Sequence, residues 1–81
     1  MLYRRKYSIM KDRIVPTAPV ERLIRAAGAH RVSATASDAL AKHLEEYGIK
    51  VAKRANSLAL HAKRTTVKGE DIEEALRQMN P

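Results

Sequence analysis

The 81-residue sequence contains no cysteine, no phenylalanine and no tryptophan, and only three tyrosines. Without cysteine there is no disulfide, no thiol nucleophile and no thiolate metal site, which fits a reducing environment. Apolar residues make up 44% of the chain, but many of them are alanine. A chain of this size and composition has little material for a core of its own. We therefore expect one small domain that shares its core with a partner.

Long apolar runs and catalytic motifs are also missing. No run approaches the roughly 20 residues that a transmembrane helix requires. The opening residues MLYRRKYSIM lack the apolar stretch of a signal peptide, so we expect no membrane segment. There is no glycine-rich phosphate loop, no HExxH motif and no nucleophile–base pair at a recognisable spacing. His30 and His43 do not stand at the spacing of metal ligands. We expect a protein that is not an enzyme and that uses neither a metal nor a cofactor.

The positive charge of the chain is concentrated near its start. The formal net charge is +7. Residues 1–15 hold five basic side chains and one acidic one, whereas residues 16–81 hold eleven and eight. This difference predicts a basic arm over 1–15 attached to a domain over 16–81. The arm is either a mobile DNA-binding tail or an extension that precedes a true start at Met10. The overall balance favours a polyanionic partner, with nucleic acid first and an anionic membrane surface second.

Apolar spacing predicts three helices and an all-α fold. The first covers about 18–28, with Thr17 as its cap, Pro19 in its first turn and Gly28 at its end. The second begins after Ser33 and runs for about 29 residues; the third covers about 69–78, with acidic residues in its first turn. The apolar positions of the three helices are Val20, Leu23, Ile24 and Ala27; Leu40, Leu44, Tyr47, Val51, Ala55, Leu58 and Ala62; and Ile72, Ala75, Leu76 and Met79.

The second helix is too long for its own domain. At ~1.5 Å per residue it extends roughly 40 Å. A compact globule of this size has a diameter of only about 28 Å. Two short helices do not cover such a stripe from end to end, so the length predicts a second copy crossed over the first. The alternative is a chain that bends at Gly48 into a small bundle.

Three stretches of the sequence resemble archaeal histones: PTAPVERLIRAAGAHRVS, ALAKHLEEYG and HAKRTTVKGEDIEEAL. Together the resemblance covers residues 16–79 without a gap. It implies a histone fold of short, long and short helices that forms a handshake homodimer. It also implies a protein that binds and wraps double-stranded DNA without reading bases.

The resemblance assigns roles to residues of the two loops and the first helix. It implies that Arg31 enters the minor groove, that Arg22 contacts phosphate and that Arg25 lies nearby. In the dimer the first loop of one chain would lie beside the second loop of the other, with Val32 and Val67 forming a strand-like pair. An ion pair between Arg64 and Asp71 would brace the second loop. The full set of implied DNA-binding residues is Arg22, Arg25, Arg31, Ser33, Arg64, Thr65, Thr66 and Lys68.

Two positions depart from the pattern of this family. Thr65 stands where relatives usually carry lysine, so one phosphate contact is expected to be missing. Dimers of this family join end to end through a surface that corresponds here to Leu58, His61, Asp71 and Glu74. Relatives often have an apolar residue at the position of Glu74, and two such carboxylates facing each other would repel.

We therefore expect a histone that compacts DNA on the chromosome, in the cytoplasmic nucleoid. Its partners would be double-stranded DNA and a second copy of itself, with a tetramer, a polymer or a histone paralogue as further possibilities. The alternative is a regulatory histone-fold protein that resembles the CCAAT-binding factors and acts as one half of a heterodimer.

Overall fold

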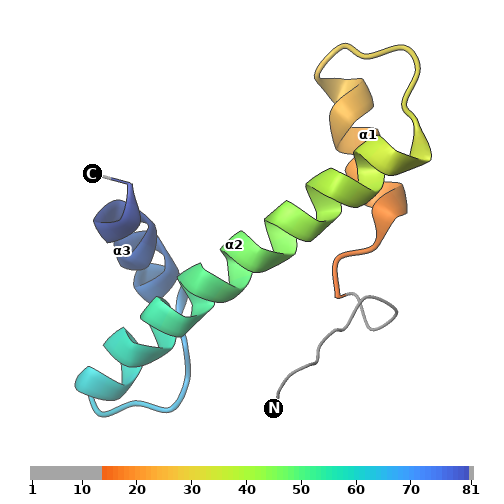
Figure 1. The fold of residues 1–81 in the computed structure, drawn as a ribbon. Helices are drawn as coiled ribbons and strands as arrows, with labels where there is room; N and C mark the ends of the chain where they lie inside the picture. Colours follow the sequence, from red (N-terminus) through yellow and green to blue (C-terminus); the bar gives the residue numbers. More distant parts are fainter. Residues whose placement is uncertain (1–13, 81) are drawn as a thin grey trace. The chain divides into compact units, whose positions relative to one another are not determined.

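Three α-helices make up most of the computed structural model, which describes residues 14–80 (Figure 1). They are α1 (Thr17–Ala26), α2 (Ala34–His61) and α3 (Gly69–Met79). Residues 14–80 contain no β-strand, so the predicted all-α class is confirmed. The contacts of the chain fall into two units, Met1–Glu45 and Glu46–Pro81, with their boundary inside α2. Most of the predicted arm, and the question of a start at Met10, lie outside the described residues.

The ends of α1 are set by proline and glycine. Pro16 occupies the cap position with an extended backbone, and no side chain caps the helix. The prediction that Thr17 is the cap was therefore wrong, because the helix already begins at that residue. The helix also ends two residues before the predicted Gly28, whose φ of 116° reverses the chain. The N–H of Gly28 donates to the carbonyl of Arg25 at 2.9 Å, and that of Ala29 to the carbonyl of Ile24 at 3.4 Å. These two bonds form a Schellman motif.

The long helix α2 has a serine cap at its start and no break in its middle. The Oγ of Ser33 accepts the N–H of Ala36 at 3.2 Å, as predicted for an N-cap. The helix continues through Gly48 for 28 residues, so the alternative of a chain bent at this glycine was wrong. A Cβ added at Gly48 would meet no atom within 4 Å.

The end of α2 repeats the geometry of the end of α1 with a different residue. The N–H of Lys63 donates to the carbonyl of Leu60, and that of Arg64 to the carbonyl of Ala59, both at 2.9 Å. This is a second Schellman motif, and Lys63 has the left-handed conformation with φ 63°. A lysine thus stands where the first motif has Gly28.

The core of each unit is built from small side chains. In the first unit Val20 and Ala41 are buried. In the second unit Ala75 of α3 packs with Val51 and Ala55 of α2. The hydroxyl of Tyr47 accepts a hydrogen bond from Asn80 at 2.7 Å. The larger residues around this second cluster, which include the predicted apolar face of α3, are only partly buried: Tyr47, Leu58, Ile72, Leu76 and Met79.

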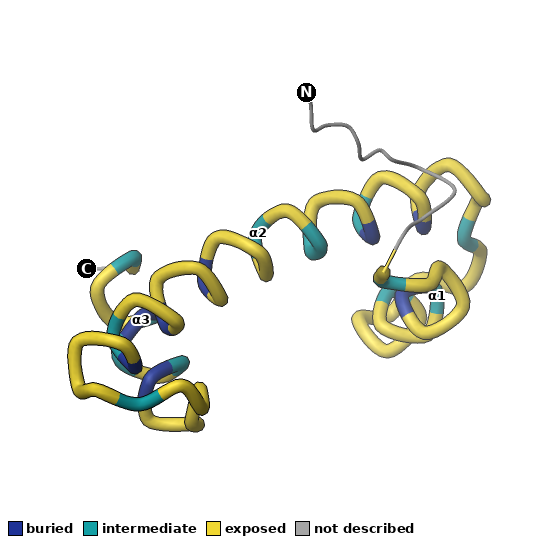
Figure 2. The backbone as a smooth tube through the Cα atoms, turned by 90° about the horizontal axis from the view of Figure 1, so that it is seen from below, coloured by how far each residue is buried: buried dark blue, intermediate teal, exposed yellow. Residues whose placement is uncertain are grey.

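Several large apolar side chains remain exposed on a single chain. Figure 2 shows how few buried positions there are along the backbone. Val20 is the largest fully buried side chain among the described residues. By contrast, the exposed fractions are 57% for Leu23, 42% for Ile49, 55% for Leu60 and 40% for Val67. The expectation of a core too thin for one chain agrees with this burial. None of the described helices has the length and apolar character needed to cross a membrane.

Candidate nucleic-acid interface

The loop between α1 and α2 is held in place by Arg25. The guanidinium of Arg25 forms an ion pair with Glu21 at 2.8 Å, one turn earlier on α1. Its Nη1 donates to the backbone carbonyl of His30 at 2.8 Å. The side chain is still about half exposed, at 48%. Arg25 therefore fixes the residue directly before Arg31, a role that its position in the sequence did not indicate.

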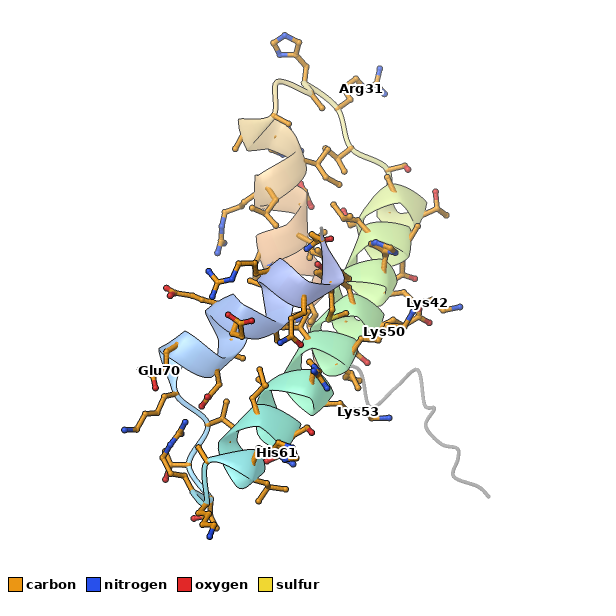
Figure 3. All side chains as sticks on the ribbon, turned by 90° about the vertical axis from the view of Figure 1, so that its left-hand side faces the viewer. Arg31, Lys42, Lys50, Lys53, His61 and Glu70 are labelled. Atoms are coloured by element: carbon orange, nitrogen blue, oxygen red, sulfur yellow. The ribbon has the colours of Figure 1, made fainter. Side chains whose placement is uncertain are left out.

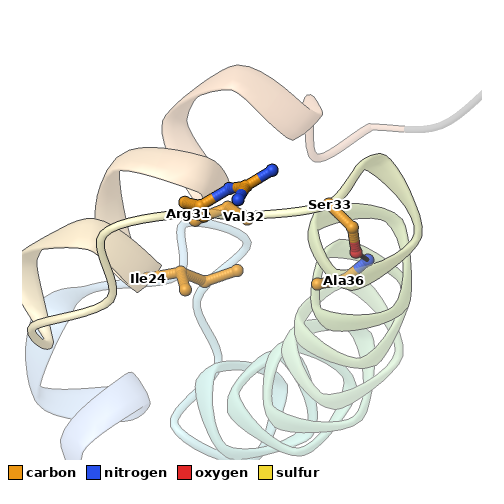
Figure 4. A pocket seen from close by; sticks show the side chains of 5 residues that line it. All are labelled: Ile24, Arg31, Val32, Ser33 and Ala36. Atoms are coloured by element: carbon orange, nitrogen blue, oxygen red, sulfur yellow. Dashed lines mark hydrogen bonds between the residues drawn. The ribbon is translucent and has the colours of Figure 1, made fainter.

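Arg31 extends from the loop that Arg25 fixes and is exposed to solvent (Figure 3). It borders an open hollow together with Val32 of the same loop (Figure 4). The remaining lining residues are Ile24 of α1 and Ser33 and Ala36 at the start of α2. Because its hydroxyl caps α2 and also bonds the Thr35 hydroxyl at 3.0 Å, Ser33 has a structural task here.

The loop between α2 and α3 is braced by the ion pair of Arg64 and Asp71. The two terminal nitrogens of Arg64 donate to the two carboxylate oxygens of Asp71, each at 3.0 Å. Nη1 also donates to the carbonyl of Thr66 at 2.9 Å. The carboxylate further accepts the backbone N–H of Lys68 at 2.8 Å, which caps the start of α3. These bonds tie the loop, the end of α2 and the start of α3 into one rigid piece.

The charges of this pair are stabilised by each other. The hydrogen bonds from Arg64, and next the N–H of Lys68, hold the pKa of Asp71 below its ordinary value. The same carboxylate raises the pKa of Arg64, and Glu70 adds a weaker attraction. Glu70 lies 3.9 Å from the guanidinium. Because Arg64 is spent on these contacts, it faces the interior of the loop more than a ligand.

The outward-facing cations of this loop are lysines. Lys63 and Lys68 are exposed, and so are Thr65 and Thr66 between them. Neither lysine takes part in an ion pair with any residue of the range 14–80. On α1, Arg22 is likewise exposed. Of the eight expected DNA-binding residues, Arg25, Ser33 and Arg64 therefore have defined intrachain partners, whereas Arg22, Arg31, Thr65, Thr66 and Lys68 are presented to solvent.

The predicted dimer–dimer surface contains a network around Glu74 that was not anticipated in full. The Glu74 carboxylate pairs with Arg77 and accepts a hydrogen bond from Gln78 at 3.1 Å. These bonds, Arg77 first, lower the pKa of Glu74. Gln78 in turn accepts from Nε of Arg54 on α2 at 2.6 Å. The i,i+3 and i,i+4 spacings from Glu74 to Arg77 and Gln78 were the available signal in the sequence.

The other predicted members of this surface differ in their exposure. His61 lies exposed at the last turn of α2 (Figure 3). Leu58 is partly buried against the cluster of Val51 and Ala55. Asp71 is buried, with 6% of its surface accessible in one chain. The structure therefore places His61 in the open and uses Asp71 mainly inside the chain.

The remaining charged side chains of α2 offer no further site. Lys42, Lys50 and Lys53 project from the helix into solvent (Figure 3). Within residues 14–80, no three histidine, aspartate or glutamate side chains are grouped in a way that could hold a metal ion. The cationic side chains of the two loops thus remain the best candidates for contact with an anionic ligand.

Comparison with known proteins shows the family. The family described as histone-like transcription factor (CBF/NF-Y) and archaeal histone matches residues 13–76. One of the two subunits named for the archaeal histone HAN1 of Thermococcus zilligii is 56% identical over 63 residues, which is 78% of this chain and 94% of the relative. The probable archaeal histone 3 of Methanocaldococcus jannaschii is 48% identical over the same shares of both chains. The chain belongs to this family as an archaeal histone, a class of DNA-binding protein for which a handshake dimer is expected.

Proposed function

We propose that two copies of this chain form a handshake homodimer that binds and wraps double-stranded DNA without reading its bases. The dimer is supported by the exposed apolar side chains of a single chain, notably Leu23, Leu60 and Val67. Contiguous exposed apolar surface is typical of a protein–protein interface. A second copy would cover the stripe of α2 that the two short helices leave open. In that arrangement Val32 of one chain would pair with Val67 of the other.

The observation that carries the DNA-binding surface is that both loops are braced from within and turn cations outward. Arg25 fixes the first loop beneath Arg31, and Arg64 with Asp71 fixes the second beneath Lys68. Preorganised cations lose little freedom when they meet phosphate, and such contacts carry no sequence information. An arginine such as Arg31 responds to the width and potential of the minor groove. Arg22, Thr65 and Thr66 would add backbone contacts.

The joining of dimers would use the surface of Leu58, His61, Asp71 and Glu74. His61 of one dimer would hydrogen-bond Asp71 of the next. Repulsion between facing Glu74 carboxylates is lessened because each carboxylate already pairs with Arg77 of its own helix. We therefore infer that dimers assemble further on DNA into particles that compact the chromosome. The place of action would be the nucleoid in the cytoplasm.

The test combines nuclease digestion with a single substitution. The protein is reconstituted on long duplex of random sequence, digested with a nuclease and sized on a gel. Regularly spaced protected fragments are expected for dimers that join along DNA. Arg31→Ala should weaken binding to every sequence tested, because the contact reads shape. Equal affinity of Arg31→Ala and parent would overturn the role of Arg31, and the absence of any protected fragment would overturn wrapping.

A heterodimer with a histone paralogue is the second candidate. One relative carries a name that makes it one subunit of a histone, and the matching family also includes histone-like transcription factors. Mass spectrometry of the complex purified from its own cells distinguishes the two. A second histone chain in equal amount would support the heterodimer, and a single chain would support the homodimer. In neither case is an enzymatic activity proposed.

A further inference from the structure

Lys63 has a backbone conformation that costs a lysine more than a glycine. It is the non-glycine residue with positive φ among residues 14–80, and its φ is 63°. The equivalent position at the end of α1 is Gly28. In the left-handed region the Cβ of an L-residue crowds the following carbonyl, whereas glycine is free of this contact. The fold therefore carries a penalty at Lys63 that it avoids at Gly28.

Nothing in the described part of the chain compensates for that penalty. The backbone bonds of the Schellman motif at Lys63 would form equally well with glycine. The side chain makes no ion pair with residues 14–80, and it is exposed. A lysine near a helix C-terminus interacts favourably with the helix dipole, but this effect is small at an exposed site.

The position of Lys63 suggests what its charge does. It stands at the start of the loop 62–68, whose rigid shape is set by Arg64 and Asp71. The next outward side chains, Thr65 and Thr66, are neutral, and the loop's other exposed lysine is Lys68. A strained residue that persists without a structural partner is often functional. Here the available chemistry is one compact positive charge on a flexible stem.

We propose that Lys63 is a DNA phosphate contact that supplies a charge the loop lacks at Thr65. The inference rests on the proposed DNA-binding function and adds a residue to it. The left-handed turn places the lysine at the outer end of the loop, and the brace of Arg64 and Asp71 holds that turn. Each dimer would carry two such contacts, one for each chain.

The experiment compares Lys63→Gly with the parent in two assays on the full chain. Thermal unfolding should show a higher Tm for Lys63→Gly, because glycine relieves the backbone. Binding to a random-sequence duplex, followed by fluorescence anisotropy across salt concentrations, should show weaker affinity. The slope of log affinity against log salt should become shallower by about 0.9 for each lost contact, or about 1.8 per dimer. Lys63→Arg keeps the charge and should keep the slope.

A charge transfer within the loop gives the sharpest control. Lys63→Gly combined with Thr65→Lys should restore the affinity and the slope while keeping the higher Tm. An unchanged slope in Lys63→Gly would overturn the proposal, and so would a lower Tm, which would assign Lys63 to stability. The failure of the wider function looks different: parent protein with no salt-dependent DNA binding at all, in which case Arg31→Ala has nothing to weaken.

Discussion

Arg64 and Asp71 meet through two parallel hydrogen bonds, both 3.0 Å long, across the loop between α2 and α3. The carboxylate is buried, the guanidinium is partly buried, and the backbone N–H of Lys68 adds a third bond to the same carboxylate. A bidentate pair of this kind fixes direction as well as distance. The loop that is proposed to touch DNA therefore owes its shape to a contact that DNA does not touch.

Asp71→Asn should lower the stability of the fold at neutral pH and make it less sensitive to acid. The pKa of Asp71 is lowered in the folded chain, chiefly by Arg64, so the folded state favours the charged form. Its stabilising contribution is present above the unfolded pKa of about 3.9 and is lost as pH falls through the lower folded value. Urea unfolding at a series of pH values measures this. The gap between parent and variant should close below about pH 4; a gap that stays constant would contradict the role of the charge.

Substitutions at Glu74 and Arg77 should change assembly in opposite directions. Glu74→Leu removes a carboxylate from the proposed dimer–dimer surface and should lengthen the particles formed on DNA. Arg77→Ala leaves Glu74 without its ion-pair partner and should shorten them, because like charges then face each other unscreened. Nuclease ladders of the two variants, with Glu73→Ala on the same helix as the matched control, provide the measurement. Shorter particles for Glu74→Leu would show that the carboxylate supports the joint.

Helix periodicity predicted the architecture well because each helix has a repeating apolar pattern. The stripes around Val51 and Ala75 lie where that pattern puts them. Helix ends were predicted less well. Whether Thr17 or Pro16 occupies the cap depends on one residue's backbone, and both give a sensible start for α1.

The site was predicted as a set of positions but not as a set of roles. The resemblance pointed to Arg25 and Arg64, and spacing alone did not show that Arg25 bonds to the carbonyl of His30. That contact depends on how the loop turns after Gly28. The strain at Lys63 was equally hidden, since a lysine is a common residue and only its φ distinguishes it.

Removal of residues 1–9 should make DNA binding less dependent on salt. This segment carries Arg4, Arg5 and Lys6 and no acidic residue. Each phosphate contact contributes about 0.9 to the slope of log affinity against log salt, so three lost contacts would lower it by about 2.7 per chain. A truncation series assayed by anisotropy on random duplex measures the slope. An identical slope would show that the arm does not touch phosphate.

Glu45→Ala should loosen the residues that lead into α1. One carboxylate oxygen of Glu45 accepts the N–H groups of Ile14 at 2.7 Å and Val15 at 3.0 Å. Hydrogen bonds to a charged acceptor at a partly exposed site contribute about 1 kcal/mol. Limited digestion with trypsin, followed by mass spectrometry, should show faster cleavage after Arg13 in this variant. Glu46→Ala, at the exposed neighbouring position, serves as the control, and equal rates for all three proteins would remove the anchoring role.

Gly48→Ala should weaken the dimer, although it improves the helix. Gly48 lies at the middle of the 28 residues of α2, and a Cβ there would meet nothing within its own chain. In an isolated helix the change to alanine is worth about 1 kcal/mol of stabilisation. If a second α2 crosses at this point, however, the added methyl group occupies the space of the partner's backbone, and overpacking of that kind costs about 1–3 kcal/mol. Sedimentation equilibrium should show a larger dissociation constant for Gly48→Ala than for the parent. Gly69→Ala, at the start of α3 and also without neighbours within 4 Å, should leave it unchanged. A tighter dimer in Gly48→Ala would mean that the helices cross elsewhere along α2.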